Sequence, residues 1–83
     1  MAPGVFDMIS AMLVERVGFD AVYASGYWLT ASHLGLPDAG LATYTNMLDR
    51  VSKVVEKSTA PVIADADTGF GGLLNVHHTV SGY

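Results

Sequence analysis

The 83-residue sequence contains no cysteine and only four lysine and arginine residues. Without cysteine there is no disulfide framework and no thiolate metal site, so a metal would have to bind through oxygen or imidazole ligands. The net charge of −4 and the scarcity of basic residues argue against a nucleic-acid-binding surface, which needs a basic stripe. We expect a small-molecule or cationic partner instead.

Long apolar runs are also missing. None approaches the roughly 20 residues that a membrane span requires, and Met1 to Gly4 lack the basic and apolar regions of a secretory signal. We therefore expect a soluble, cytoplasmic protein without a membrane partner.

Charged residues are scarce too, at 14% of the chain, whereas 51% of its residues are hydrophobic. Globular domains usually have about 25% charged residues. A small domain buries only about 60% of its extended surface, so much of this apolar content would stay exposed to water. We infer that the chain assembles with copies of itself or forms part of something larger.

Two segments are predicted to form helices with apolar faces. In the first, from Val5 to Val17, an apolar face recurs at helical spacing, Asp7 is the expected N-cap and Gly18 ends the helix. The second runs from about Tyr44 to Lys57, with Thr43 as its expected N-cap. The predicted apolar positions of the first helix are Val5, Met8, Ile9, Met12, Leu13 and Val17.

Two short apolar segments, residues 19–25 and 61–65, are predicted to be buried strands. Residues 32–40 contain glycines and a proline and are predicted to form a long loop, and Asn75 is a candidate cap for a third helix. This alternation of helices and strands is typical of parallel α/β folds. Two strands alone do not form a stable sheet, so further strands are expected.

The segment "PVIADADTGFGG", residues 61–72, places Asp65 and Asp67 at the carboxyl end of the second predicted strand. Residues i and i+2 of an extended segment point to the same side, so the two carboxylates are expected to converge. Two close carboxylates need a cation or a shared proton, and Mg²⁺ suits one or two carboxylates with water and substrate oxygens. The alternative is that Asp65 caps the loop and Asp67 is simply solvated.

Three segments together resemble the isocitrate lyase and phosphoenolpyruvate mutase superfamily, nearest in pattern to 2-methylisocitrate lyases. They are "APGVFDMISA", "YASGYWLTASHLGLPDAGLAT" and "PVIADADTGFGG", which span nearly the whole chain. The resemblance implies an α/β fold, a partial (β/α)8 TIM barrel covering about the first three βα units. Residues 1–83 would then be the N-terminal part of a single catalytic domain, truncated at both ends, because a barrel takes about 250 residues.

The resemblance also implies roles for individual residues. Asp65 matches the carboxylate that approaches an Mg²⁺ or Mn²⁺ ion most directly, and Asp67 and Asp38 match acids that hold the ion largely through water. Ser25 and Gly26 match the turn whose backbone N–H groups receive the substrate carboxylate, while Tyr23 matches a tyrosine that faces the substrate in lyases. Asp38 and Tyr23 are the catalytic candidates.

The implied activity is metal-dependent cleavage of a C–C bond in a 2-hydroxy di- or tricarboxylic acid. The metal and the N–H groups would stabilise the negative charge of an enolate. The same stabilisation permits phosphoenolpyruvate or phosphonopyruvate mutase or hydrolase activity and oxaloacetate decarboxylation. The parent enzyme would be a homotetramer, and this chain alone would be inactive.

The sequence departs from the superfamily pattern at Tyr27-Trp28, where lyases commonly carry small residues. These aromatics would form a wall beside the substrate or belong to the core. His33 is expected to have a plain loop role. His77 and His78 are expected at the surface or in packing, because adjacent helical residues point about 100° apart.

Two further interpretations remain. A phosphotransferase of the haloacid-dehalogenase type also places Asp-x-Asp after a strand, but Gly69 stands where it needs threonine or valine. The second is a non-catalytic remnant that folds poorly or associates through exposed apolar faces.

Overall fold

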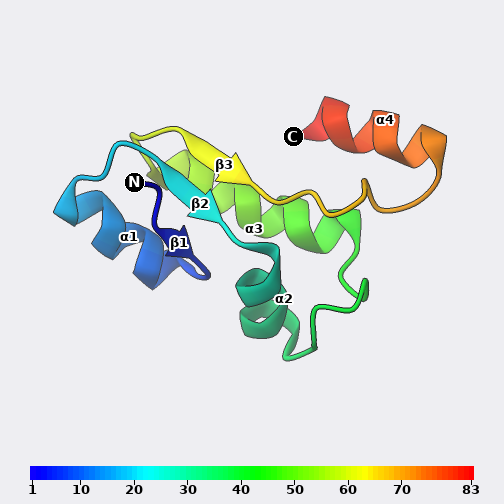
Figure 1. Ribbon diagram of the computed structural model, residues 1–83, viewed down its shortest axis with the longest axis horizontal. Coiled ribbons are helices and arrows are strands. Elements are labelled where there is room, and N and C mark those ends of the chain that lie inside the picture. Colours follow the sequence, from blue (N-terminus) through cyan, green and yellow to red (C-terminus); the bar gives the residue numbers. More distant parts are fainter.

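The computed structural model describes residues 1–83 and has the α/β character that the sequence predicts. The chain forms three short strands and four helices. Figure 1 shows the helices placed around the strands and beyond their carboxyl ends. In chain order the elements are β1 (Gly4–Val5), α1 (Met8–Val17), β2 (Val22–Ala24), α2 (Gly26–Leu34), α3 (Tyr44–Lys57), β3 (Val62–Ala64) and α4 (Leu73–Gly82).

The three strands form one parallel sheet in the order β1-β2-β3. Gly4 pairs with Tyr23 and Tyr23 with Ile63, so these positions form one row across the sheet. Because the strands are parallel, their carboxyl ends all lie at the same edge. The chain segments that leave this edge, which include α2 and the connection to α4, are therefore gathered at one end of the sheet (Figure 1).

The helices cover only one face of the sheet. Val5, Val22 and Ala24 on the covered face are at most 1% exposed, whereas Ile63 is 55% exposed. Since successive side chains in a strand alternate between faces, Ile63 and its neighbour Tyr23 belong to the uncovered face. The sheet thus has one packed face and one open face.

Two small clusters of buried side chains lie on the packed face. One lies between the sheet, α1 and α3, and the other between β2, α2 and α3, next to the carboxyl ends of the strands. The first consists of Val5, Ala11, Val22 and Val54. The second consists of Ala24, Leu29, Met47 and Val51. The second cluster supports the segments from which the candidate site is built.

The two predicted helix caps are confirmed. Asp7 accepts a hydrogen bond from the Ser10 amide at 2.7 Å, and the Ser10 hydroxyl oxygen accepts one from the Asp7 amide. Thr43 and Asn46 form the same reciprocal arrangement at the start of α3. Both arrangements satisfy amides that the first helical turn leaves without partners.

The first helix differs from its prediction in two ways. It begins at Met8, because Val5 pairs with Ala24 in β1 and is fully buried. Most of the predicted apolar face points to solvent, and Ala11 lies against the core instead. The exposed residues are Ile9 at 70%, Met12 at 54%, Leu13 at 59% and Val17 at 72%. The helix is apolar on nearly all sides, and the small Ala11 side allows the closest approach to the sheet.

The segment after β2 also differs from its prediction. Residues 26–34 form α2, so the predicted loop of residues 32–40 begins inside a helix that sequence periodicity did not indicate. The strands are shorter than predicted, extending only over residues 22–24 and 62–64. The last helix begins at Leu73 with Gly72 as its N-cap, and Asn75 lies inside the first turn, where its side chain accepts from the Gly72 amide.

No helix of the structure is both long enough and apolar enough to span a bilayer.

We expect Asp7→Ala to loosen the start of α1. Loss of an N-cap side chain costs about 1 kcal/mol, which corresponds to roughly fivefold faster exchange of the amides in the first turn. Hydrogen exchange followed by mass spectrometry measures this effect. Asp20→Ala is the matched control, because Asp20 carries the same charge at an exposed position and accepts no hydrogen bond. Equal exchange in both variants would show that the cap contributes nothing.

Candidate functional site

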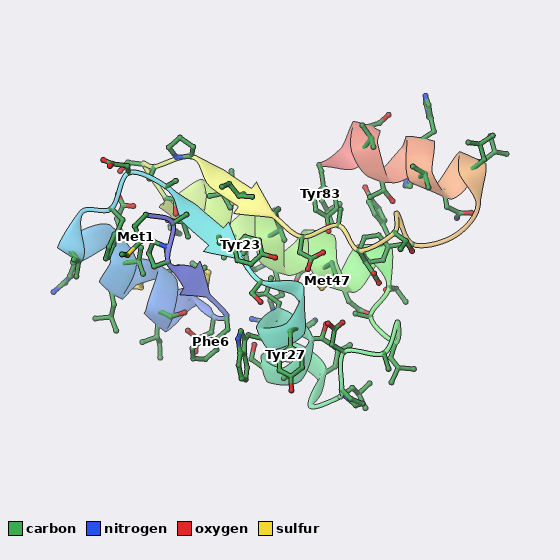
Figure 2. All side chains as sticks on the ribbon, viewed as in Figure 1. Met1, Phe6, Tyr23, Tyr27, Met47 and Tyr83 are labelled. Atoms are coloured by element: carbon green, nitrogen blue, oxygen red, sulfur yellow. The ribbon has the colours of Figure 1, made fainter.

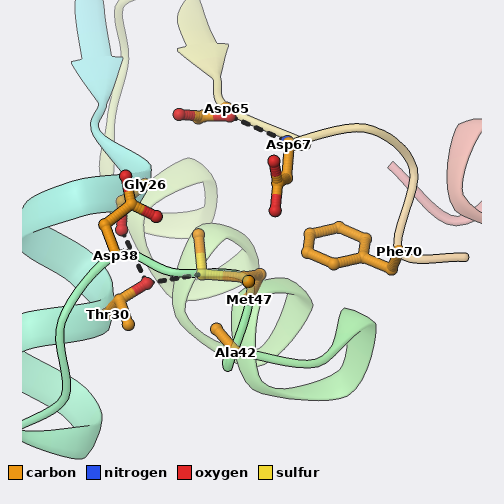
Figure 3. Close-up of a pocket in the computed structure, with 9 residues that line it drawn as sticks. Gly26, Thr30, Asp38, Ala42, Met47, Asp65, Asp67 and Phe70 are labelled. Atoms are coloured by element: carbon orange, nitrogen blue, oxygen red, sulfur yellow. Dashed lines mark hydrogen bonds between the residues drawn. The ribbon is translucent and has the colours of Figure 1, made fainter.

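A small pocket lies at the carboxyl edge of the sheet, where the predicted acidic residues meet. Its volume is about 50 Å³, which is space for about three water molecules. Figure 3 shows side chains from α2, α3 and the two loops around it. The lining residues are Gly26, Thr30, Asp38, Gly40, Ala42, Met47, Asp65, Asp67 and Phe70.

Asp65 is positioned by the sheet. Its amide donates to the Ala24 carbonyl at 3.1 Å, which continues the pairing of β2 and β3 by one residue. Because side chains alternate along a strand, Asp65 shares the open face with Ile63. Its carboxylate is half-buried, with Oδ1 accepting a hydrogen bond from the Asp67 amide at 2.8 Å.

Asp67 lines the pocket, but its backbone conformation differs from the extended one that the sequence predicts. Its φ of 51° lies in the left-handed region, so the segment after Asp65 turns and is not extended. The argument that i and i+2 side chains point the same way therefore does not apply here. The turn instead brings the Asp67 amide back to the Asp65 carboxylate, while the exposed Asp67 side chain still lines the pocket. A non-glycine residue in this region carries local strain.

Asp38 comes from the exposed loop between α2 and α3 and completes the set of three carboxylates. The three line one pocket, yet the structure contains no group of three or more acidic or histidine side chains close enough to hold an ion together. Carboxylate oxygens nevertheless suit Mg²⁺, which is commonly held by one or two carboxylates and keeps several waters. The donor chemistry therefore fits a hydrated divalent cation.

Tyr23 and Ser25 lie beside the pocket and do not line it. Tyr23 is half-buried on the open face of the sheet, in register with Ile63. Ser25 is the N-cap residue of α2, but its side chain caps no amide. The first amides of α2 are therefore left without a side-chain partner, next to a pocket that Gly26 lines.

Sequence reasoning missed five lining residues: Gly40 and Ala42, in the same loop as Asp38, and three side chains from other segments, Thr30, Met47 and Phe70. Thr30 lies one helical turn after Gly26 and donates its hydroxyl to the Gly26 carbonyl at 2.8 Å. Met47 forms part of the pocket floor, and Phe70 takes a left-handed φ of 61° that presents its ring to the pocket (Figure 3). For these three side chains the only available signal was the aromatic residue among glycines in "TGFGG", because the other two contributions depend on how α2 and α3 pack.

Tyr27 and Trp28 belong neither to the pocket wall nor to the core. They are 51% and 57% exposed, and their rings stack edge-to-face with centroids 4.7 Å apart. Their exposure therefore corrects the alternative that they belong to the core. Figure 2 shows Tyr27 projecting from α2 on the side away from Met47.

His33 is also a packing residue and does not lie in a loop. It is part of α2, and its Nδ1 accepts a hydrogen bond from Arg50 Nε of α3 at 2.9 Å. That bond ties together two helices that support the pocket. His77 and His78 are exposed on α4, as predicted, and neither belongs to a metal-binding group.

An aromatic cluster joins α4 to the start of α3. The Tyr44 ring lies 4.7 Å from His78, 6.3 Å from Phe70 and 6.3 Å from Tyr83, measured between ring centroids. Burial raises the pKa of Tyr83, and the negative charge of Asp65 and the neighbouring Tyr44 raise this pKa further. The pKa of Tyr83 is therefore coupled to the charge of Asp65, which lines the pocket.

Residues 1–82 match the model of the phosphoenolpyruvate phosphomutase family. The chain belongs to this family. It is 54% identical over 83 residues to a 2,3-dimethylmalate lyase of Eubacterium barkeri, covering 100% of this chain and 29% of that protein. It is 43% identical to an isocitrate lyase of Haloferax volcanii, covering 99% of this chain and 24% of the relative.

The fold of this chain also matches solved structures of family members. A crystal structure of 2,3-dimethylmalate lyase, described as a PEP mutase/isocitrate lyase superfamily member, superposes with a TM-score of 0.92 at 40% identity, covering 98% of this chain and 29% of that one. Oxaloacetate acetylhydrolase in complex with oxalate gives 0.94 at 39% identity, covering 99% and 29%. The chain thus spans less than a third of the length of these relatives.

The family membership confirms the resemblance read from the three sequence segments. It also decides against the haloacid-dehalogenase interpretation of the Asp-x-Asp pair. Several relatives are named as lyases, of 2,3-dimethylmalate, isocitrate and 2-methylisocitrate. The α/β architecture matches the N-terminal part of the solved family structures.

Replacing Asp65 by asparagine should lower the pKa of Tyr83 while leaving it above the ordinary 10.0, because burial is the larger cause of the rise. The folded state favours the neutral phenol, so this contribution to stability is fully present below pH 10.0 and is lost as the pH rises through the folded pKa. NMR titration of ¹³C-labelled tyrosine measures the pKa, and chemical unfolding at a series of pH values measures the stability. Asp20→Asn is the control, and an identical shift in both variants would contradict the coupling to Asp65.

Proposed function

We propose that residues 1–83 form the metal- and substrate-binding N-terminal part of a Mg²⁺-dependent carbon–carbon lyase. The substrate would be a small 2-hydroxy di- or tricarboxylic acid that is cleaved through an enolate. The observation that carries the proposal is one pocket that combines Asp38, Asp65 and Asp67 with the uncapped start of α2. The similarity to 2,3-dimethylmalate lyase supports the class of reaction.

Three carboxylates on one small pocket favour a cation. Their negative charges and oxygen ligands suit a hydrated Mg²⁺ ion. Asp65 would approach the ion most directly, since its carboxylate is fixed by the sheet and by the Asp67 amide. Asp67 and Asp38 would act through water molecules. A bound Mg²⁺ would neutralise this charge and polarise the oxygens of the substrate.

The start of α2 would hold the substrate carboxylate. Amides at a helix N-terminus are directed outward and carry partial positive charge, which makes them suited to an anion. Ser25 does not cap them with its side chain, and Gly26 brings the backbone to the pocket surface. The pocket holds only about three waters, so most of the substrate would lie over the open face, beside Tyr23.

We further propose that this chain is the first part of a (β/α)8 barrel catalytic domain. A parallel sheet with one covered and one open face suits a barrel interior, and both edge strands of the sheet lack an outer partner. The exposed apolar side of α1 supports subunit contacts in a homotetrameric parent enzyme.

Two other activities have specific support. The likeness to oxaloacetate acetylhydrolase favours hydrolysis of a related oxo acid, and the plant relative named carboxyvinyl-carboxyphosphonate phosphorylmutase favours phosphorus–carbon chemistry. Oxaloacetate decarboxylation would use the same charge stabilisation. All of these activities would use the same pocket, so they differ in what the rest of the enzyme supplies.

The assignment is tested by comparing Asp65→Ala with Asp67→Ala in a complete enzyme that carries this chain. Removal of a group that acts through water costs about 10- to 100-fold, and removal of a direct ligand should cost more. Mg²⁺-dependent cleavage of 2,3-dimethylmalate, 2-methylisocitrate and isocitrate gives the rates. Asp20→Ala is the control for loss of charge. Near-wild-type rates for both pocket variants would exclude the metal assignment.

The 83-residue chain alone should show no lyase turnover and should bind Mg²⁺ no more tightly than millimolar. Its sheet is open on one face, and ordering costs roughly 1.5 kcal/mol per residue, which so small a core scarcely offsets. We expect a partly helical, associating species. Amide exchange and titration with Mg²⁺ plus oxalate measure this. A monomer with slowly exchanging strands and micromolar, oxalate-dependent binding would contradict the expectation.

A further inference from the structure

Gly26 and Asp65 approach each other more closely than any side chain at position 26 would allow. A Cβ atom placed on Gly26 would lie 2.6 Å from Asp65 Oδ2, 2.9 Å from its Cγ and 3.3 Å from its Cβ. Gly26 has an ordinary helical backbone, so its conformation alone would accept any residue. The proximity of Asp65 is therefore the reason that a glycine is needed here.

The Asp65 carboxylate is bounded on its other side as well. Oδ1 accepts from the Asp67 amide at 2.8 Å, and the Asp65 amide is bound to the Ala24 carbonyl at 3.1 Å. The sheet thus fixes the Asp65 backbone, and the turn fixes the Asp65 Oδ1 atom. The other oxygen, Oδ2, faces Gly26, the first residue of α2. Figure 3 shows Asp67 beside Asp65, joined to it by the hydrogen bond, and Gly26 next to Asp38 at the start of α2.

We infer that Gly26 is a positioning residue for Asp65: its missing side chain sets where Oδ2 lies and so how the carboxylate faces the pocket. This inference rests on the proposed function in treating Asp65 as the principal cation ligand. It differs from the role of Gly26 as an N–H donor to the substrate, because an alanine would keep the N–H group. A methyl group would instead push Oδ2 away and strain the bond from the Asp67 amide.

A double-mutant cycle isolates this contact. Gly26→Ala adds the methyl group, and Asp65→Gly removes the three nearest atoms that the methyl group would meet. The contact is direct if Gly26→Ala is harmful with Asp65 present and harmless in the Asp65→Gly background. Gly4→Ala is the matched control, because a Cβ there would meet nothing within 4 Å and its backbone is also ordinary.

In a complete enzyme that carries this chain, folding stability follows the cycle, and two further readouts compare Gly26→Ala with the wild type. The ¹H–¹⁵N resonance of the Asp67 amide reports the bond to Asp65 Oδ1 without any metal, and Mn²⁺ binding, followed by electron paramagnetic resonance, reports the carboxylate as a ligand. We expect Gly26→Ala to move the Asp67 amide resonance and to weaken Mn²⁺ binding about 10- to 100-fold. Gly4→Ala should change neither.

The outcomes separate the inference from the proposed function. If the Asp67 resonance and Mn²⁺ affinity of Gly26→Ala match the wild type while only the KM for the acid rises, Gly26 serves as an N–H donor and the inference is wrong. If the wild type binds no Mn²⁺ but the Asp67 resonance moves, the positioning role holds and the metal proposal fails. If Gly26→Ala does not fold, folding of the double variant supports the inference, and its failure to fold overturns it.

Discussion

The parallel pairing of β2 with β3 continues one residue past Ala64, and the candidate site depends on that extension. The bond from the Asp65 amide to the Ala24 carbonyl sets the end of β3 beside the point where β2 turns into α2. A shift of register by one residue would move Asp65 to the packed face. Val62 and Ala64 of β3 oppose such a shift, because both pack against the buried clusters and would have to leave the packed face.

The pocket also depends on helix packing beneath it. Leu29 of α2 and Val51 of α3 belong to the second buried cluster, and Arg50 bonds to His33 across the same two helices. These contacts fix the start of α2 relative to the loop that carries Asp38. On the other side, Thr79 of α4 is buried and donates to the Gly69 carbonyl at 2.9 Å, which secures the loop after Asp67.

The open face of the sheet and the exposed side of α1 account for the unusual composition. A chain with 51% hydrophobic residues and 14% charged residues has more apolar surface than its own core can cover. Ile63 on the sheet and Ile9 on α1 are both more than half exposed. The apolar excess noted in the sequence is therefore located on two definite surfaces, and relatives more than three times as long have further chain with which to cover them.

Much of the architecture depends on local signals and could be predicted from the sequence. Asp7 and Thr43 begin helices because each side chain bonds an amide three residues later, a contact that needs no distant partner. The α/β alternation and the Asp65 position at a strand end follow from apolar runs and their boundaries. Three spaced segments were sufficient to identify the family.

Contacts between distant segments determine the packed side of α1, the helix α2 and the approach of Gly26 to Asp65. The predicted face of α1 is wrong because the helix is apolar on nearly all sides, and only the sheet selects Ala11 as its packed side. The helix α2 escaped prediction because Leu29 is buried by Met47 and its neighbours, which lie in a different helix. From the sequence alone, Gly26 and Asp65 could each be placed just after a predicted strand. Only the parallel register brings them together, since hydrogen bonds between β2 and β3 join residues about forty positions apart.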